Sequence, residues 1–380
     1  MKKYLSIVLV LLSLAAPLLA DTTDTKGGPN IPKEYTYSPD SLALYLDMNY
    51  ANDDQKLEAL YEWITHNMSY NVYITFQSKN EAPDEEKEIR TTLRLREGVC
   101  RQFALLFERV ANALCIPVFM VNGYTRSSNV ISPYPHSWCI AKVGSEWYCY
   151  DPTFDMGYTE NQRFVSDPRK VYYRMAPQVF VRNHMPFDPI FQALPQPLYY
   201  QTFDNGEKVQ AARQQYNFND SILIYSRQAP IDQLRRSIQR VRTNGAPNRL
   251  IDYFLELSES NLKIYICNQV RATFYESMRL QNLAEDKRRE MARKIKAGFK
   301  SMTDEDIKDL MEECSSSIKE SDALLRSVTE IPDIYKANFA QLRQFIDNTM
   351  NRVEQVNEIG SKYLQAKPNK RKEYIRYYMQ

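Results

Sequence analysis

The sequence carries almost no net charge. It contains 49 Lys and Arg residues against 47 Asp and Glu residues, and Lys2 and Lys3 account for this small excess. Domains that bind nucleic acid gather basic side chains into a surplus on one face, so the balance gives no electrostatic footprint for nucleic acid. The C-terminal segment KPNKRKEYIRYYMQ is basic, but one short cluster is typical of a solvated tail. We therefore expect no nucleic-acid partner.

Long apolar runs are missing after the N-terminus. The first segment, MKKYLSIVLVLLSLAAPLLADTT, has two lysines, an apolar run and then the small residue Ala20, an order that predicts a secretory signal peptide over residues 1–20. Two serines and a proline interrupt the run, which is shorter than the about 20 residues that span a bilayer. A retained anchor is the alternative. The first cysteine is Cys100, which excludes a lipoprotein anchor after the run. We expect a mature protein that is soluble, does not span a membrane, and is periplasmic or secreted from a bacterium.

A disulfide framework is lacking as well. Six cysteines in an exported chain would ordinarily predict a set of disulfide bonds. However, Cys139 and Cys149 fall on opposite faces of a predicted hairpin, and Cys267 and Cys314 lie far apart in a predicted pair of helices. A chain of 380 residues can bury a core without such cross-links.

Histidine is rare, with three residues in the chain, and one of them opens the segment HSWCIAKVGSEWYCYDPTFD, residues 136–155. Gly144-Ser145 between two apolar runs predicts a two-residue hairpin turn in which Trp138 faces Asp151. In this register His136 and Asp151 are diagonal neighbours on one face, within reach of a hydrogen bond. A three-residue loop would shift the register by one residue and separate them. An imidazole oriented by a carboxylate is two parts of a catalytic triad, and the nucleophile is still missing.

A candidate nucleophile lies upstream, in LREGVCRQFALLFERVANALCIPVFMVNGY. Gly98 breaks the chain, apolar residues follow at helical spacing and Pro117 ends the run, so the pattern predicts a helix that begins near Cys100. A helix N-terminus carries partial positive charge, and Arg101 adds to it, so both favour the reactive thiolate. The alternative is a buried cysteine that only fills space. We assign that structural role to Cys115 and Cys139.

These segments resemble the transglutaminase-like superfamily. Gly98-Val-Cys100 at a helix start, His136-Ser-Trp138 and the segment WYCYDPTFD follow its order of a cysteine on a helix, then a histidine and an aspartate on neighbouring strands. LYEWITHNMSY resembles the helix before the cysteine, and VYYRMAPQVFVRNHMPFDPIFQAL resembles the segment after the aspartate in the branch that includes kyphoscoliosis peptidase. The resemblance covers residues 36–200. Cys115 departs from it, because glycine often precedes Ile-Pro in this family.

The resemblance implies a papain-like α+β core and three catalytic roles. Cys100 would be the nucleophile, His136 the general base and then acid, and Asp151 the residue that orients the imidazole, in acyl transfer through a thioester. The backbone N–H of Cys100 would stabilise the oxyanion in part, and Tyr70 and Asn71 are candidates for the second donor. This chemistry implies no cofactor and no metal.

Other residues of catalytic type are weaker candidates. His184 lies in the Pro-rich segment NHMPFDP, which is typical of a loop, and His66 lies inside the predicted upstream helix. Trp138 and Trp147 are interpreted as packing residues.

The chain is predicted to consist of a signal peptide (1–20), a polar linker (21–35), a transglutaminase-like domain (36–200) and a helical domain (201–380). In the last part, apolar or small residues at alternating steps of three and four predict helices packed side by side, which we expect to form a bundle or hairpin. The two stripes are Ile307, Met311, Cys314, Ile318, Ser321, Leu325, Val328 and Tyr335, Phe339, Leu342, Ile346, Thr349, Val353, Val356, Gly360, Tyr363. A third helix is predicted over residues 247–298, and Thr303–Asp306 resembles a capping box.

Three functions fit these patterns. The first is an exported cysteine peptidase or amidase that acts on peptide or protein amides. The second is a protein-crosslinking transglutaminase, and the third is a non-catalytic interaction module that works through the helical domain. The first is favoured over the second because water is always available as the acceptor and no pattern marks an amine site. A protein partner or self-association through the helical domain is compatible with all three.

Overall fold

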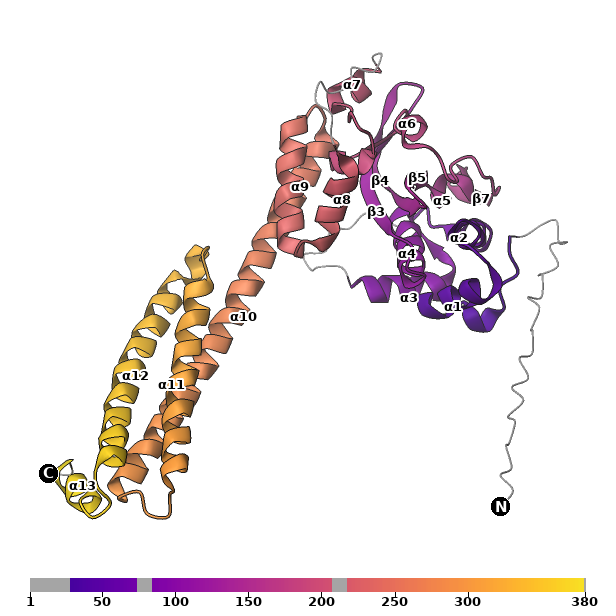
Figure 1. The fold of residues 1–380 in the computed structure, drawn as a ribbon. Helices are drawn as coiled ribbons and strands as arrows, with labels where there is room; N and C mark the ends of the chain where they lie inside the picture. Colours follow the sequence, from indigo (N-terminus) through magenta and orange to yellow (C-terminus); the bar gives the residue numbers. More distant parts are fainter. Residues whose placement is uncertain (1–27, 74–83, 207–216, 379–380) are drawn as a thin grey trace, which may run out of the picture. The chain divides into compact units, whose positions relative to one another are not determined.

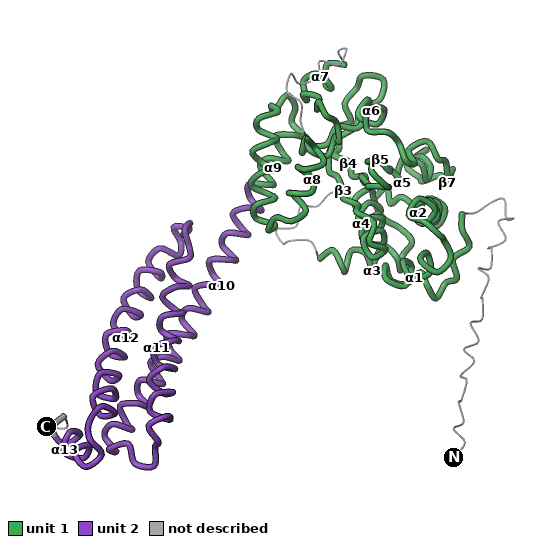
Figure 2. The backbone as a smooth tube through the Cα atoms, in the orientation of Figure 1, with its two compact units in different colours: residues 1–258 green, residues 259–380 purple. Residues whose placement is uncertain are grey.

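The computed structural model describes residues 28–73, 84–206 and 217–378 (Figure 1). The predicted signal peptide, residues 1–20, lies outside the described residues, as does the linker up to residue 27. Packing divides the chain within one long helix into two compact units, residues 1–258 and 259–380 (Figure 2). The first unit contains an α+β core with an antiparallel half-barrel sheet, and the chain ends in a long all-helical region, as the sequence predicts.

The central sheet of the first unit has four antiparallel strands in the order β5-β4-β3-β8. These strands are β3 (Val118–Ser127), β4 (Val130–Val143), β5 (Glu146–Tyr150) and β8 (His184–Pro186). Val143 pairs with Glu146 and Cys139 with Tyr150, and Gly144 takes φ +61° at the turn between them. This is the predicted two-residue hairpin register. Two short pairs complete the strands: parallel β1 (Ser69–Tyr70) and β2 (Glu97–Gly98), and antiparallel β6 (Gly157–Glu160) and β7 (Arg163–Ser166).

Some helices of the first unit begin after a residue whose side chain caps the helix. Ser38 and Asn52 each accept a backbone N–H with their side chains at a helix start. The helices are η1 (Lys33–Tyr35), α1 (Pro39–Asn49), α2 (Asp53–Asn67), α3 (Glu85–Leu95), α4 (Cys100–Ala113), α5 (Pro152–Asp155), α6 (Pro177–Phe180), η2 (Pro189–Gln192), α7 (Tyr200–Asn205), α8 (Phe218–Arg227) and α9 (Pro230–Asn244). Helix α4 therefore begins at Cys100, as predicted.

The two faces of the sheet bury two separate cores. Cys139, Ala141 and Tyr150 pack with α1, α2 and α4 on one face. Trp138, Ile140, Trp147 and Cys149 belong to a second core, with residues of η2 and α8. The alternation of side chains along the strands produces this division. It also confirms that Cys139 and Cys149 face opposite ways, and all six cysteines are free. Cys139 is buried as expected, but Cys115 is exposed, so its interpretation as a buried structural cysteine is wrong.

Up to residue 378, where the described chain ends, the second unit is built from three long helices and a short one. Helix α10 (Arg249–Lys296) crosses the division, and α11 (Asp304–Ser327), α12 (Asp333–Gln365) and α13 (Arg371–Tyr378) follow. Thr303 and Asp306 form the predicted capping box at the start of α11. The predicted stripes are buried from Ile307 to Leu325, apart from half-buried Met311, and from Phe339 to Gly360; their outer members are half-buried.

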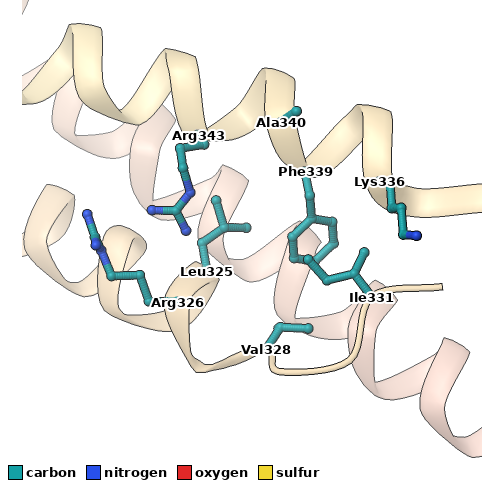
Figure 3. A pocket seen from close by; sticks show the side chains of 8 residues that line it. All are labelled: Leu325, Arg326, Val328, Ile331, Lys336, Phe339, Ala340 and Arg343. Atoms are coloured by element: carbon teal, nitrogen blue, oxygen red, sulfur yellow. The ribbon is translucent and has the colours of Figure 1, made fainter. Parts of the chain in front are cut away.

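Helices α11 and α12 leave a groove near their connection. Its lining is Leu325, Arg326, Val328, Ile331, Lys336, Phe339, Ala340 and Arg343, and Figure 3 shows the Phe339 ring pointing toward Ile331. Arg326 and Arg343 both pair with Asp322, so their charges are partly neutralised. None of the helices within the described residues has the length and apolar character needed to cross a membrane.

Candidate functional site

Cys100 lies at the first turn of α4, where the preceding chain is held in place. Gly98 pairs with Tyr70 in the β1–β2 pair, and the Asn71 N–H donates to the Gly98 carbonyl at 2.8 Å. The Val99 N–H donates to the Gln102 side chain at 2.9 Å, which satisfies a backbone group at the helix start. Only 3% of Cys100 is exposed. The sulfur is therefore held at a helix N-terminus and faces the protein, as the sequence predicts.

Arg101 has a different environment from the one expected. Its guanidinium pairs with Glu85 and Glu88 of α3, at 3.3 Å in each case. Its charge is shared with those carboxylates, so it adds little to the field at Cys100. The positive charge that interacts with Cys100 is that of His136.

His136 lies in β4 and Asp151 directly follows β5. The Nε2 atom of His136 is 2.6 Å from Oδ2 of Asp151, which is the hydrogen bond that the hairpin register predicts. Burial alone would lower the pKa of His136, but the Asp151 carboxylate and, to a smaller extent, the interaction with Cys100 raise it to about 10. The structure therefore brings Cys100, His136 and Asp151 together.

Asp151 is fully buried, and each oxygen of its carboxylate is used. Oδ1 accepts the backbone N–H groups of Thr153 and Phe154, at 3.0 and 3.3 Å, as the N-cap of α5. Oδ2 faces two histidines, His136 at 2.6 Å and His184 at 3.1 Å. Although burial opposes ionisation, the charge of His136 and the hydrogen bonds hold the pKa of Asp151 well below its usual range. The carboxylate is thus ionised at neutral pH.

The Asp151 backbone is also fixed. Its carbonyl accepts the Tyr61 hydroxyl at 2.8 Å, and its N–H donates to the Tyr172 carbonyl at 3.1 Å. Tyr61 donates as well to Asp155, whose carboxylate accepts the Tyr172 N–H at 2.7 Å. These contacts tie the residues after β5 to α2 and to the segment before α6.

His184 was interpreted from sequence as a loop residue, and that interpretation is wrong. It is the first residue of β8, pairs with Thr125 of β3, and is buried. The rings of His184 and Phe180 are stacked with their centres 4.0 Å apart. Sequence alone gives little sign of this position, because β8 has three residues and joins the sheet through a strand far away in the chain.

His136, Asp151 and His184 also have the donor atoms of a metal site, all within 4.8 Å of one another. The 2.6 Å separation of Nε2 and Oδ2 is a direct hydrogen-bond distance. Two ligand atoms that share one tetrahedral Zn²⁺ at about 2.0–2.2 Å each would lie farther apart. The arrangement fits a chain of hydrogen bonds better than a metal centre.

Tyr70 lies beside the same site. Burial, with electrostatic contributions from Cys100 and Asp151, raises the pKa of Tyr70 to about 12. Its hydroxyl therefore keeps its proton at neutral pH and can donate a hydrogen bond. His66 instead bonds the carbonyl of Glu62 within α2 at 2.7 Å. Trp138 and Trp147 are buried in the core, as expected for packing residues.

Known proteins resemble the part of the chain that carries this site. Residues 40–152 match the family model of the transglutaminase-like superfamily. Kyphoscoliosis peptidase of Mus musculus is 24% identical over 163 residues, and that of Homo sapiens is 23% identical over 162 residues. These alignments cover 41% and 40% of this chain and 24% of each relative. The chain thus spans about a quarter of the length of the curated relatives that it matches.

Two solved structures are also similar to this chain. A TGase has 18% sequence identity and a TM-score of 0.25, covering 38% of this chain and 37% of that one. A suspected cysteine protease from Cytophaga hutchinsonii has 21% identity and a TM-score of 0.24, covering 38% of this chain and 50% of that one.

Proposed function

We propose, on the premise that residues 40–152 are transglutaminase-like, that this chain is an exported cysteine peptidase or amidase acting on peptide or protein amides. Cys100 is the nucleophile, His136 the general base and acid, and Asp151 the residue that orients His136. The observation that carries the proposal is the 2.6 Å bond between His136 and Asp151, with Cys100 at the start of a helix and interacting electrostatically with the same imidazole.

The proposed reaction has two halves. The Cys100 sulfur attacks the amide carbonyl carbon and forms a tetrahedral intermediate, with the imidazole of His136 holding the thiol proton. His136 gives that proton to the leaving amine as the C–N bond breaks, which leaves a thioester. Water then attacks the thioester carbonyl carbon while His136 takes its proton. The C–S bond breaks, the carboxylic acid leaves, and His136 returns the proton to the sulfur. Because Nε2 of His136 is bound to Asp151, Nδ1 is the nitrogen left to exchange the proton with the sulfur in this proposal.

The developing oxyanion needs donors close to the sulfur. The Cys100 N–H supplies one, because the first N–H groups of a helix have no partner within the helix. Tyr70 is favoured over Asn71 as the second donor, because Cys100 and Asp151 act electrostatically on the Tyr70 hydroxyl, whereas the Asn71 backbone N–H already donates to the Gly98 carbonyl.

Export is part of the proposal and depends on sequence alone. The two lysines, the apolar run and Ala20 support a cleaved leader over residues 1–20. Expression of the full chain in a bacterium, followed by cell fractionation and N-terminal sequencing, tests it. Mature protein in the periplasm or medium is expected; uncleaved protein in the cytoplasm would contradict it.

Turnover is tested with a mixture of diverse peptides and proteins. New termini or released ammonia, measured by mass spectrometry and an ammonia assay, are expected with the wild type and lost in Cys100→Ala. The exposed Cys115 provides the matched control, since Cys115→Gly also removes a thiol but lies outside the site. Incorporation of an added primary amine in place of hydrolysis would favour the crosslinking alternative. An inert wild type would favour the non-catalytic module.

A further inference from the structure

We propose that His184 is a positioning residue that holds the Asp151 carboxylate against His136 from the opposite side, as a neutral imidazole whose Nε2–H donates to Oδ2. This inference rests on the proposed function, because a positioning role has meaning only where His136 and Asp151 serve Cys100.

The first support is the geometry at the carboxylate. Oδ2 of Asp151 has His136 at 2.6 Å and His184 at 3.1 Å, while Oδ1 is occupied by the backbone of α5. A carboxylate rotated about its last bond would lose bonds at both oxygens. Since His184 comes from β8 and His136 from β4, two strands that flank β3 fix the same oxygen.

The second support is the apolar enclosure of the His184 ring. Phe180 stacks on it, and Trp138 and Tyr172 present tilted or edge-on rings at 5.2 and 5.4 Å between centres. The side chain has no exposed surface. Burial outweighs the attraction of Asp151 and lowers the pKa of His184 to about 4, so the ring is neutral at pH 7.

A neutral ring has one N–H, and its partners determine where that proton lies. Asp151 accepts only, so the proton belongs on Nε2. The remaining nitrogen, Nδ1, then needs a donor, and it lies 2.7 Å from the side-chain amide of Asn183. The two ends of an amide exchange places without a change of shape. The structure has the Asn183 oxygen at Nδ1 and the Asn183 NH₂ group donating to the Tyr172 hydroxyl at 3.0 Å. A neutral His184 with its proton on Nε2 requires the exchanged assignment, in which the NH₂ group donates to Nδ1 and the amide oxygen accepts the Tyr172 hydroxyl.

The result is a directed chain of hydrogen bonds from Tyr172 through Asn183 and His184 to Asp151. Tyr172 itself is anchored by its backbone to Asp151 and Asp155. Asn183, on the far side of the ring from Asp151, thus determines which nitrogen of His184 carries the proton. Histidines whose orientation matters commonly have such a partner on their second nitrogen.

The kinetic test compares two substitutions of His184 in the full chain. His184→Phe removes the donor and keeps an aromatic ring; His184→Gln keeps an N–H that can reach Asp151. Alkylation of Cys100 by iodoacetamide at pH 6 should slow about tenfold in His184→Phe and recover to within about threefold of wild type in His184→Gln. Met185→Ala is the matched control, since Met185 is buried in the same strand. It should lower the melting temperature without slowing alkylation.

A spectroscopic test is independent of reactivity. The chain has three histidines, so each imidazole signal can be assigned by substitution in an NMR spectrum of histidine-labelled protein. His184 should carry its proton on Nε2 at neutral pH, and its signals should change in Asp151→Asn.

The outcomes separate this inference from the proposed function. A wild type in which Cys100 reacts no faster than a free thiol would contradict the proposed function. A reactive wild type with His184→Phe alkylated at the same rate, or with the His184 proton on Nδ1, would overturn the positioning role alone. If the alkylation rate falls equally in His184→Phe, His184→Gln and Met185→Ala, then His184 has only a structural role. That result would also overturn the positioning role.

Discussion

At the scale of single residues, buried charge is the feature that organises this core. Asp151, with no exposed surface, is held by hydrogen bonds from two backbone N–H groups and two imidazoles. Such a carboxylate is stable in an apolar interior only while its partners remain. A second acidic group, Glu108 of α4, accepts a hydrogen bond from the Met120 N–H and is not paired with a histidine.

The titration of Glu108 alone predicts how the free energy of unfolding changes with pH. Its Oε1 accepts the Met120 N–H at 2.8 Å, yet burial outweighs this bond and raises its pKa to about 7 from 4.5. Between these pH values the folded state binds more protons than the unfolded state, so the free energy of unfolding falls as pH rises. Glu108→Gln keeps the acceptor and should remove this slope. We expect the variant to be more stable than wild type by about 1 kcal/mol or more at pH 8.

Urea unfolding at a series of pH values measures this effect. The difference between Glu108→Gln and wild type should shrink as pH falls toward 4.5. A difference that is constant across this range, or a variant less stable at pH 8, would show that Glu108 is not a buried acid of raised pKa.

At the scale of elements, local patterns predicted those features that local residues determine. Gly144-Ser145 determined the β4–β5 register, and Gly98 with the following apolar run determined the start of α4 at Cys100. The stripes of α11 and α12 could also be predicted from the sequence, because one face of each helix is buried along most of its length. In these cases a contact follows from the spacing of neighbouring residues.

Features that depend on distant pairing were not predictable in this way. The contact of His184 with Asp151 requires β8 to pair with β3, and three residues carry no recognisable strand pattern. The pairing of Arg101 with Glu85 and Glu88 requires α3 to pack beside α4. The division within α10 depends on packing along a continuous helix, which has no sequence break at that point.

Gly123 should be the most sensitive glycine of the sheet. A Cβ atom there would lie 2.2 Å from the Met185 carbonyl oxygen and 2.4 Å from Cη2 of Trp138. Gly123→Ala must therefore displace β8 or the indole that contacts His184. We expect a loss of about 1–3 kcal/mol in the free energy of unfolding, together with slower alkylation of Cys100.

Gly144→Ala is the control for Gly123→Ala. A Cβ atom at Gly144 meets no neighbour within 4 Å, and only its φ of +61° opposes the change. It should cost about 1–2 kcal/mol and leave the alkylation rate of Cys100 unchanged. If Gly123→Ala behaves like Gly144→Ala in both measurements, then the approach of β8 to Trp138 does not support the site.

At the scale of the whole molecule, the helical second unit is held by its own contacts. Ser277 and Ser321 exchange hydrogen bonds between α10 and α11, and Gln281 donates to Thr349 across α10 and α12. Gly360 allows Met291 and Met311 to approach α12 closely. The three helices thus pair their buried polar groups and apolar faces with one another. We therefore expect the second unit to unfold cooperatively.

Two phenylalanines of α12 test this independence. Phe339 is 4% exposed and Phe345 is 51% exposed. Phe339→Asp with Ile346→Asp should unfold the second unit, because each change places a charge in the core; loss of the Phe339 side chain alone costs about 3–5 kcal/mol. Phe345→Asp should leave it folded. Circular dichroism follows the helix content, and alkylation of Cys100 should persist in both variants.

A folded double variant would contradict that prediction. If it also changed from dimer to monomer on a sizing column, the α12 stripe would be an interface between two chains rather than an internal seam.

The most direct test of the central claim is the pH dependence of Cys100 alkylation in wild type and His136→Ala, with Cys115→Gly in both backgrounds to remove the exposed thiol. His136 stays protonated up to about pH 10 beside Asp151, and a neighbouring positive charge makes a cysteine more reactive. We predict that the wild type reacts at pH 6 at least about tenfold faster than His136→Ala. If both proteins react alike, and only above about pH 8 where ordinary thiols ionise, then Cys100 is not an activated nucleophile.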